Sequence, residues 1–186
     1  MIDLAKRIID ARCGGHVERC HVIPHQGSYN NAAHSWGVAM LMYALWPEDF
    51  ERLALICLTH DIPEGWTGDP PSFLFDHLPE LRAAVSDVEG TVSNSLRLPS
   101  EVGLDPIDRA KLKACDRLEL YLWCREQKAF GNTFVEGCLG RLRCMFIEKP
   151  LPEPAHTLFR QFEIISILPR QGNILKTLGE VSHDAE

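Results

Sequence analysis

The amino-acid sequence predicts an all-α protein, a single domain over residues 1–186 built from about six to seven helices. Apolar residues recur at the three- and four-residue spacing of amphipathic helices along most of the chain. No segment shows the apolar and polar alternation that is typical of a half-buried strand, and no internal repeat is present. A chain of 186 residues can bury one complete hydrophobic core, which agrees with a single domain.

The first three expected helices each carry an apolar face and stop at a residue that disfavours helix. Gly14 and Gly15 follow the first, Pro47 separates the second from the third, and Pro63 follows the third. Residues 16–31 lack a clear period and contain proline and glycine, so we expect a loop there. The three helices are predicted over residues 2–12, 33–46 and 47–61.

A second loop and four further helices complete the predicted fold. Residues 63–75 contain two glycines and several prolines, which are typical of turns. Asp105 is the expected N-cap of the longest helix, Pro106 follows it at the first helical position, and Gly131 ends it. The core is expected over residues 1–150, followed by a C-terminal helix and a loosely ordered tail. The four helices are predicted over residues 78–98, 105–130, 133–147 and 155–168.

The composition is that of an ordinary globular protein, with 45% hydrophobic and 24% charged residues and a formal net charge of -7. This acidic balance argues against a nucleic-acid or anionic-membrane partner, because such surfaces need clustered lysine and arginine. The sequence has no signal-peptide core and no long apolar run, so we expect a cytoplasmic protein without a membrane span. The seven cysteines are scattered and contain no CxxC, which predicts free thiols.

One stretch concentrates groups that can bind a metal ion. The third predicted helix ends in adjacent His60 and Asp61, which places a nitrogen and an oxygen donor together just before a proline. His34 opens an earlier helix, and Asp116 interrupts an otherwise apolar helical face. Three helices would then supply the mixture of nitrogen and oxygen donors that a borderline divalent cation accepts. We therefore expect His34, His60, Asp61 and Asp116 to be metal ligands.

Each of these residues also has an alternative structural role. A histidine and aspartate pair at a helix end could be a cap or a surface ion pair, and His34 could be a core histidine. Asp116 could pair with an arginine, since a buried carboxylate needs a partner. Arg19, in the first loop, could carry a binding role or be a solvated surface residue. Asp69, in Thr67-Gly68-Asp69, could be a turn or cap residue.

The order H…HD…D resembles the HD-domain metal-dependent phosphohydrolases, and most closely the YfbR-type 5′-deoxynucleotidases and related phage deoxynucleotide hydrolases. HDxxE followed by TGD, with an arginine fifteen residues before the first histidine, is more specific than HD alone. The resemblance covers about the first two thirds of the chain, in the family's order. Three segments carry it: Glu18-Arg19 through His34-Ser35-Trp36-Gly37-Val38-Ala39, His60-Asp61-Ile62-Pro63-Glu64 with Thr67-Gly68-Asp69, and Lys113-Ala114-Cys115-Asp116.

The resemblance implies an HD-type helical bundle with one divalent metal ion per site, of the set Co, Mn, Zn, Fe and Mg. It implies that His34, His60, Asp61 and Asp116 are the metal ligands. It further implies that Glu64 is the catalytic general acid/base. The implied substrate-binding residues are Arg19, which binds the phosphate, Asp69, which lies near the sugar 3′-hydroxyl, and Thr67 and Cys20 near Asp69.

Three positions depart from the family's usual pattern. Cys20 stands where the family usually has a tryptophan beside the sugar, Ala33 where it often has a glutamate, and Phe75 where it often has a lysine. All three bear on the substrate and none belongs to the metal-ligand set.

The predicted function is metal-dependent hydrolysis of a 2′-deoxynucleotide phosphoester, as a 5′-deoxynucleotidase that releases phosphate from deoxynucleoside monophosphates. One alternative is a triphosphohydrolase that releases triphosphate from a deoxynucleoside triphosphate. The other is a non-catalytic nucleotide-binding module on an HD fold. The resemblance also implies a homo-oligomer, a dimer or larger, for which the apolar run at 162–168 is a candidate contact.

Overall fold

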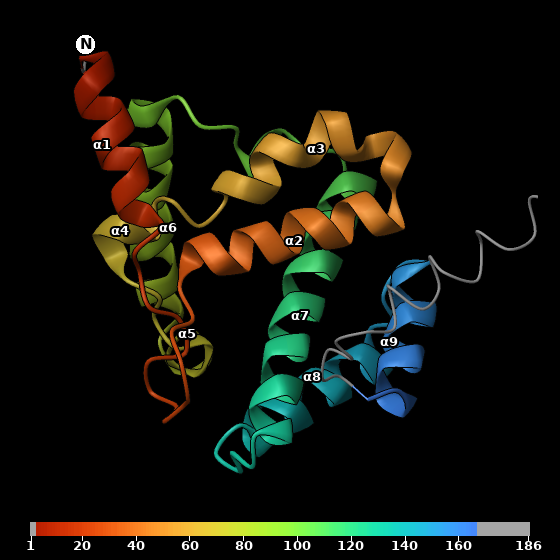
Figure 1. The fold of residues 1–186 in the computed structure, drawn as a ribbon. Coiled ribbons are helices and arrows are strands. Elements are labelled where there is room, and N and C mark those ends of the chain that lie inside the picture. The colour runs from red at the N-terminus through yellow and green to blue at the C-terminus, as the bar shows by residue number, and fades with distance from the viewer. Residues whose placement is uncertain (1–2, 167–186) are drawn as a thin grey trace, which may run out of the picture.

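The computed structural model describes residues 3–166, and in this part of the chain the fold is all-α, as predicted. The only extended pairing among these residues is an isolated bridge between Glu18 and Asn30, at the two ends of the first loop. Figure 1 shows the elements, which are α1 (Leu4–Gly14), α2 (Asn31–Leu45), α3 (Pro47–Thr59), α4 (Glu64–Thr67), α5 (Ser72–His77), α6 (Pro79–Leu96), a 3-10 turn η1 (Glu101–Gly103), α7 (Pro106–Ala129), α8 (Glu136–Glu148) and α9 (Ala155–Ile164).

The predicted helices are all present, and the expected loop at 63–75 contains two further short helices, α4 and α5. Pro63 lies four residues after the end of α3, has a helical backbone with φ -60° and ψ -23°, and caps the N-terminus of α4. Proline disfavours continuation of a helix and yet suits the start of a new one. Gly68, with φ +75°, then ends α4.

Other boundaries differ by a few residues. Helix α3 ends at Thr59 instead of residue 61, so that His60 is its C-cap, and α8 begins at Glu136 instead of residue 133. Helix α9 ends at Ile164, whereas residues 167 and 168 of the predicted helix, and the predicted tail, lie outside the described residues. None of the helices in residues 3–166 has the length and apolar character needed to cross a membrane.

The core lies where α2, α3 and α7 meet. Helix α2 packs against both α3 and α7, and Figure 1 shows α7 crossing it in the middle of the molecule. Helices α1, α4, α5 and α6 gather at one end of α2, whereas α8 and α9 lie beside α7 (Figure 1). The largest apolar side chains that α2, α3 and α7 bury completely are Val38, Met42, Leu53, Leu112, Leu118 and Tyr121.

A close approach of two backbones holds the segment that follows α3. Gly14, the last residue of α1, is buried, and a Cβ atom there would lie 2.3 Å from the backbone oxygen of Ile62. Gly65 in α4 faces the same point, because a Cβ on it would lie 3.1 Å from the Cα of Gly14. The end of α1 therefore supports the turn that carries His60 and Asp61.

We expect Gly14→Ala to lower the free energy of unfolding by about 1–3 kcal/mol, the usual cost of forcing extra atoms into a packed interior. The atoms in the way belong to the backbone of Ile62, which cannot rotate aside. Urea unfolding measures the change. Gly140→Ala in α8 is the control, because a Cβ there meets nothing within 4 Å, and it is expected to gain about 0.5–1 kcal/mol. Equal stability of the Gly14 variant and the unmodified chain would contradict this account.

Candidate metal centre

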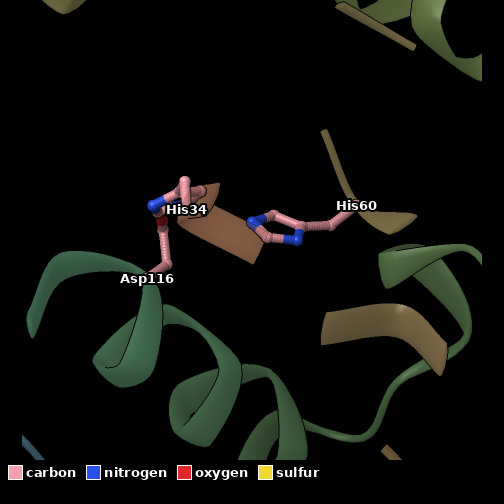
Figure 2. Close-up of side chains that lie close together, drawn as sticks. All are labelled: His34, His60 and Asp116. Carbon is pink, nitrogen blue, oxygen red and sulfur yellow. The ribbon is translucent and has the colours of Figure 1, made fainter. Parts of the chain in front are cut away.

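Three of the predicted metal ligands converge on one point. His34 lies in the first turn of α2, whose N-cap Asn30 accepts a hydrogen bond from the backbone N–H of Ala33. His60 follows α3, and Asp116 comes from the middle of α7. Ligand atoms of these three side chains all lie within 4.8 Å of one another. Figure 2 shows the imidazole of His60 extending toward His34 and Asp116.

The fourth predicted ligand, Asp61, lies beside this cluster and has an additional partner. Its Oδ2 is 3.4 Å from the Nε2 atoms of both His34 and His60. The same oxygen accepts a hydrogen bond of 2.6 Å from Nη1 of Arg19. Asp61 therefore connects the two imidazoles to the guanidinium.

The two histidines present nitrogen atoms that suit a metal ion. Nε2 of His34 and Nε2 of His60 are buried and have no hydrogen-bond partner. The opposite ring nitrogens are engaged: Nδ1 of His60 lies 3.0 Å from the backbone oxygen of Cys57, and Nδ1 of His34 contacts the carboxylate of Glu119. With the proton on Nδ1, each Nε2 carries a lone pair. Two such nitrogens and the carboxylate of Asp116 fit a divalent cation of the borderline class.

The charge balance around His34 is consistent with a cation. Burial lowers the pKa of His34, but the nearby carboxylates of Asp116, whose Oδ1 is 3.2 Å from Nε2, and of Glu119 outweigh burial and raise the pKa to about 9. Burial raises the pKa of Asp116, while its contact with His34 and the charge of Lys113 hold this pKa well below its usual range. A positive charge among these side chains is thus favoured, and a divalent cation would supply it in place of the proton.

Glu64, the predicted acid/base, is the first residue of α4 and lies next to Asp61. Its Oε2 accepts a hydrogen bond of 2.8 Å from Nδ2 of Asn31 and is 3.6 Å from Nη1 of Arg19. Asn31 also donates to the backbone oxygen of Asp61 and accepts from Arg19. Burial and the nearby charge of Asp61 raise the pKa of Glu64 to about 9, although Arg19 opposes this rise.

The predicted substrate residues lie near the same network. Oδ2 of Asp69 accepts a hydrogen bond of 3.0 Å from the backbone N–H of Cys20, which ties the loop after Arg19 to the turn after α4. Cys20 has a left-handed backbone, with φ +52°. The hydroxyl of Thr67 donates instead to Glu89 in α6. Arg19, Cys20 and Asp69 are therefore brought together, and their roles toward a substrate stay predictions.

A cavity of about 960 Å³ opens beside these residues. It extends from His60, Asp61 and Glu64 to α5, α6 and the segment before α7. Two positively charged side chains of the cavity wall already have hydrogen-bond partners. Lys113 donates to the carboxylate of Glu101 at 3.0 Å, and Arg109 donates to backbone carbonyls, including that of Glu101 at 2.9 Å. The charged side chains on the wall away from the metal ligands are Arg82, Glu89, Glu101, Arg109 and Lys113.

Sequence reasoning missed several residues of this centre. Glu119 lies three residues after Asp116 on α7, and Asn31 lies three residues before His34 on α2, so each is one helical turn from a predicted ligand. This one-turn spacing from a predicted ligand was the sequence signal that could have identified Glu119 and Asn31. Tyr29, which donates to Glu119, and Glu89 had no signal, because tertiary packing alone brings them to the site.

Two known enzymes are similar to this chain in sequence. A dATP triphosphohydrolase of Salmonella phage PMBT28 is 32% identical over 126 residues, which are 60% of this chain and 62% of the phage protein. A 5′-deoxynucleotidase of Vibrio cholerae is 27% identical over 164 residues, 76% of this chain and 84% of that enzyme. The match to the phage enzyme thus spans less than two thirds of its length.

A solved structure supports the fold. The cyanophage S-2L HD phosphohydrolase DatZ, bound to dA and one catalytic Zn²⁺ ion, superimposes with a TM-score of 0.58 at 21% identity, covering 88% of this chain and 95% of that chain. The family model described as 5′-deoxynucleotidase YfbR-like matches residues 15–143, well over half of the sequence. The chain therefore belongs to the YfbR-like 5′-deoxynucleotidase family and has the all-α fold of an HD phosphohydrolase.

Proposed function

We propose that this chain hydrolyses the phosphoester of 2′-deoxynucleotides in a divalent-metal-dependent reaction, with deoxynucleoside monophosphates as substrates. One observation carries the proposal: two buried imidazole nitrogens without partners and a carboxylate oxygen lie within 4.8 Å of one another. His60 of this cluster lines the cavity together with Glu64. Family membership and the Vibrio cholerae relative support the substrate class.

The type of the donor atoms also favours some metal ions over others. We propose that His34, His60 and Asp116 bind the cation, with Asp61 as a fourth ligand. When bound, the cation polarises a phosphoryl oxygen and makes a water molecule more acidic. Two imidazoles suit zinc, cobalt, iron or manganese better than magnesium, which prefers an all-oxygen shell. The cyanophage neighbour, described with a catalytic Zn²⁺, is consistent with this order.

The remaining residues would handle protons and phosphate. Glu64 lies at the cavity wall next to Asp61, and its raised pKa keeps a proton on the carboxyl near neutral pH, from where it can be delivered to the leaving oxygen. Arg19 offers a planar set of donors to phosphate oxygens, and its Nη1 already points at Asp61 in the centre. Asp69, held by the N–H of Cys20, is proposed to accept from the sugar 3′-hydroxyl.

A second candidate function is triphosphate release from a deoxynucleoside triphosphate. The cavity of about 960 Å³ is at the upper end of ligand-pocket sizes, and the 32% identical phage relative is a dATP triphosphohydrolase. However, Lys113 is paired with Glu101, and Arg109 is bonded to backbone carbonyls. The charge of Lys113 is therefore balanced by a carboxylate, and donors of Arg109 are already engaged, which leaves fewer free donors for three phosphates and favours the monophosphate. A homo-oligomeric state and a cytoplasmic location stay predictions.

The direct test is a panel of deoxy- and ribonucleoside mono- and triphosphates with Zn²⁺, Co²⁺, Mn²⁺ or Mg²⁺, in which phosphate and triphosphate are measured separately. We expect phosphate release from deoxynucleoside monophosphates. Triphosphate as the main product would establish the second candidate instead. Tight nucleotide binding without turnover under any metal would identify a non-catalytic binding module.

Glu64→Gln is expected to lower the turnover rate about 10²–10⁴-fold, the usual contribution of a positioned acid/base. The amide keeps the size of the side chain but cannot carry the proton, so bound metal should be unchanged. Steady-state kinetics and metal analysis of the same sample measure the two effects. Glu51→Gln on the exposed surface of α3 is the matched control. An unaltered rate would remove Glu64 from the mechanism.

Asp116→Asn is expected to abolish both bound metal and activity, because it removes the negative charge of a ligand while keeping its shape. Elemental analysis of the purified variant measures metal content, and Asp87→Asn on the exposed face of α6 is the control. Full metal content in the Asp116 variant would show that this carboxylate is not a ligand.

A further inference from the structure

A second set of side chains, Glu119 and Tyr29, contacts His34 at Nδ1, the ring nitrogen opposite the one that faces the metal centre. Nδ1 of His34 contacts Oε2 of Glu119, and the hydroxyl of Tyr29 donates to the same carboxylate oxygen. The Tyr29 hydroxyl is also 3.2 Å from His34 Nδ1. The side chain of His34 is completely buried, so no water competes for these contacts.

Helix α7 carries the proposed metal ligand Asp116, Glu119 of this second set, and Trp123. Asp116, Glu119 and Trp123 follow one another at three- and four-residue spacing, so they share one face of α7. Trp123 stacks on Tyr29, with ring centroids 4.5 Å apart and planes at 11°. This stacking holds the Tyr29 ring in place, and its hydroxyl in turn holds Glu119.

Gly37 of α2 leaves the space that Glu119 occupies. A Cβ atom on Gly37 would lie 2.6 Å from Cγ and 3.1 Å from Oε1 of Glu119. A shift of the Glu119 side chain away from such a Cβ would disturb its contacts with His34 and Tyr29. Gly37 is one helical turn after His34, so the same face of α2 carries the histidine and the gap beside it.

We propose that Glu119 is a positioning residue of the metal centre, which accepts the Nδ1–H of His34 and so aims Nε2 at the cation. Tyr29 and Gly37 hold Glu119 in that position. The proposal rests on the metal site of the proposed function and adds three residues that touch neither metal nor substrate. A carboxylate in this position fixes the tautomer of a metal-bound histidine and strengthens its basicity.

The test is a Co²⁺ titration of the full chain after removal of metal by a chelator, followed through the visible absorption of bound Co²⁺. Glu119→Gln is expected to weaken Co²⁺ binding about 10–100-fold and to alter the absorption spectrum, because the His34 ring is held less firmly. Glu126→Gln, an exposed glutamate of the same helix, is the matched control and should bind as the unmodified chain does. Urea unfolding of the metal-free proteins separates a loss of folding from a loss of affinity.

A double-mutant cycle tests the part of Gly37. Gly37→Ala alone is expected to weaken Co²⁺ binding by pushing Glu119 aside. In a Glu119→Ala background the same change should cost nothing further, because the clashing side chain is gone. Additive losses would overturn the role assigned to Gly37.

The outcomes also separate this inference from the proposed function. If the unmodified chain takes up no Co²⁺, the metal centre and the proposed function both fail. If the unmodified chain and Glu119→Gln bind Co²⁺ with equal affinity and identical spectra, only the role of Glu119 fails. Should Glu119→Gln not fold, Tyr29→Phe removes a single hydroxyl from the same carboxylate. It should then weaken binding by a smaller factor, and unchanged binding would count against the proposal.

Discussion

Two buried imidazole nitrogens without hydrogen-bond partners, Nε2 of His34 and Nε2 of His60, are the constraint on which the rest of this structure depends. The rings lie 5.6 Å apart; His34 belongs to α2, and His60 directly follows α3. A buried polar atom left unpaired costs about 1–3 kcal/mol. A fold that keeps both atoms away from water and holds their opposite nitrogens in place has the form of a preorganised cation site, and α7 completes it by supplying Asp116.

The second constraint is the negative charge gathered around this point. The carboxylates of Asp61, Asp116 and Glu119 contact the imidazole of His34, and Glu64 lies next to Asp61. Arg19 neutralises part of this charge through its hydrogen bond with Asp61. Buried carboxylates are stable only when they are paired or bind a metal. The same charges that favour a cation therefore also hold Arg19 beside the centre.

The predictable part of the site follows from local rules. Adjacent His60-Asp61 at a helix end, His34 in a first turn and Asp116 on an apolar face could be read along the chain, because helix periodicity assigns each a direction. Tyr29 and Gly37 could not, because their contribution is a contact with Glu119, which lies more than eighty residues away. The two short helices in residues 63–75 were missed because prolines are typical of turns and also suit the start of a helix, as Pro63 does before α4 and Pro71 before α5.

By itself the sequence determined the all-α class, the long helices and the identity of the groups able to bind a metal, since these depend on residue type and spacing within single elements. Only the tertiary structure decided that donor atoms of His34, His60 and Asp116 lie within 4.8 Å of one another. It also decided that Asp61 accepts a hydrogen bond from Arg19 and that Glu119 contacts Nδ1 of His34. Contacts of this kind join separate helices, and their geometry is set by how α2, α3 and α7 pack, which no local pattern specifies.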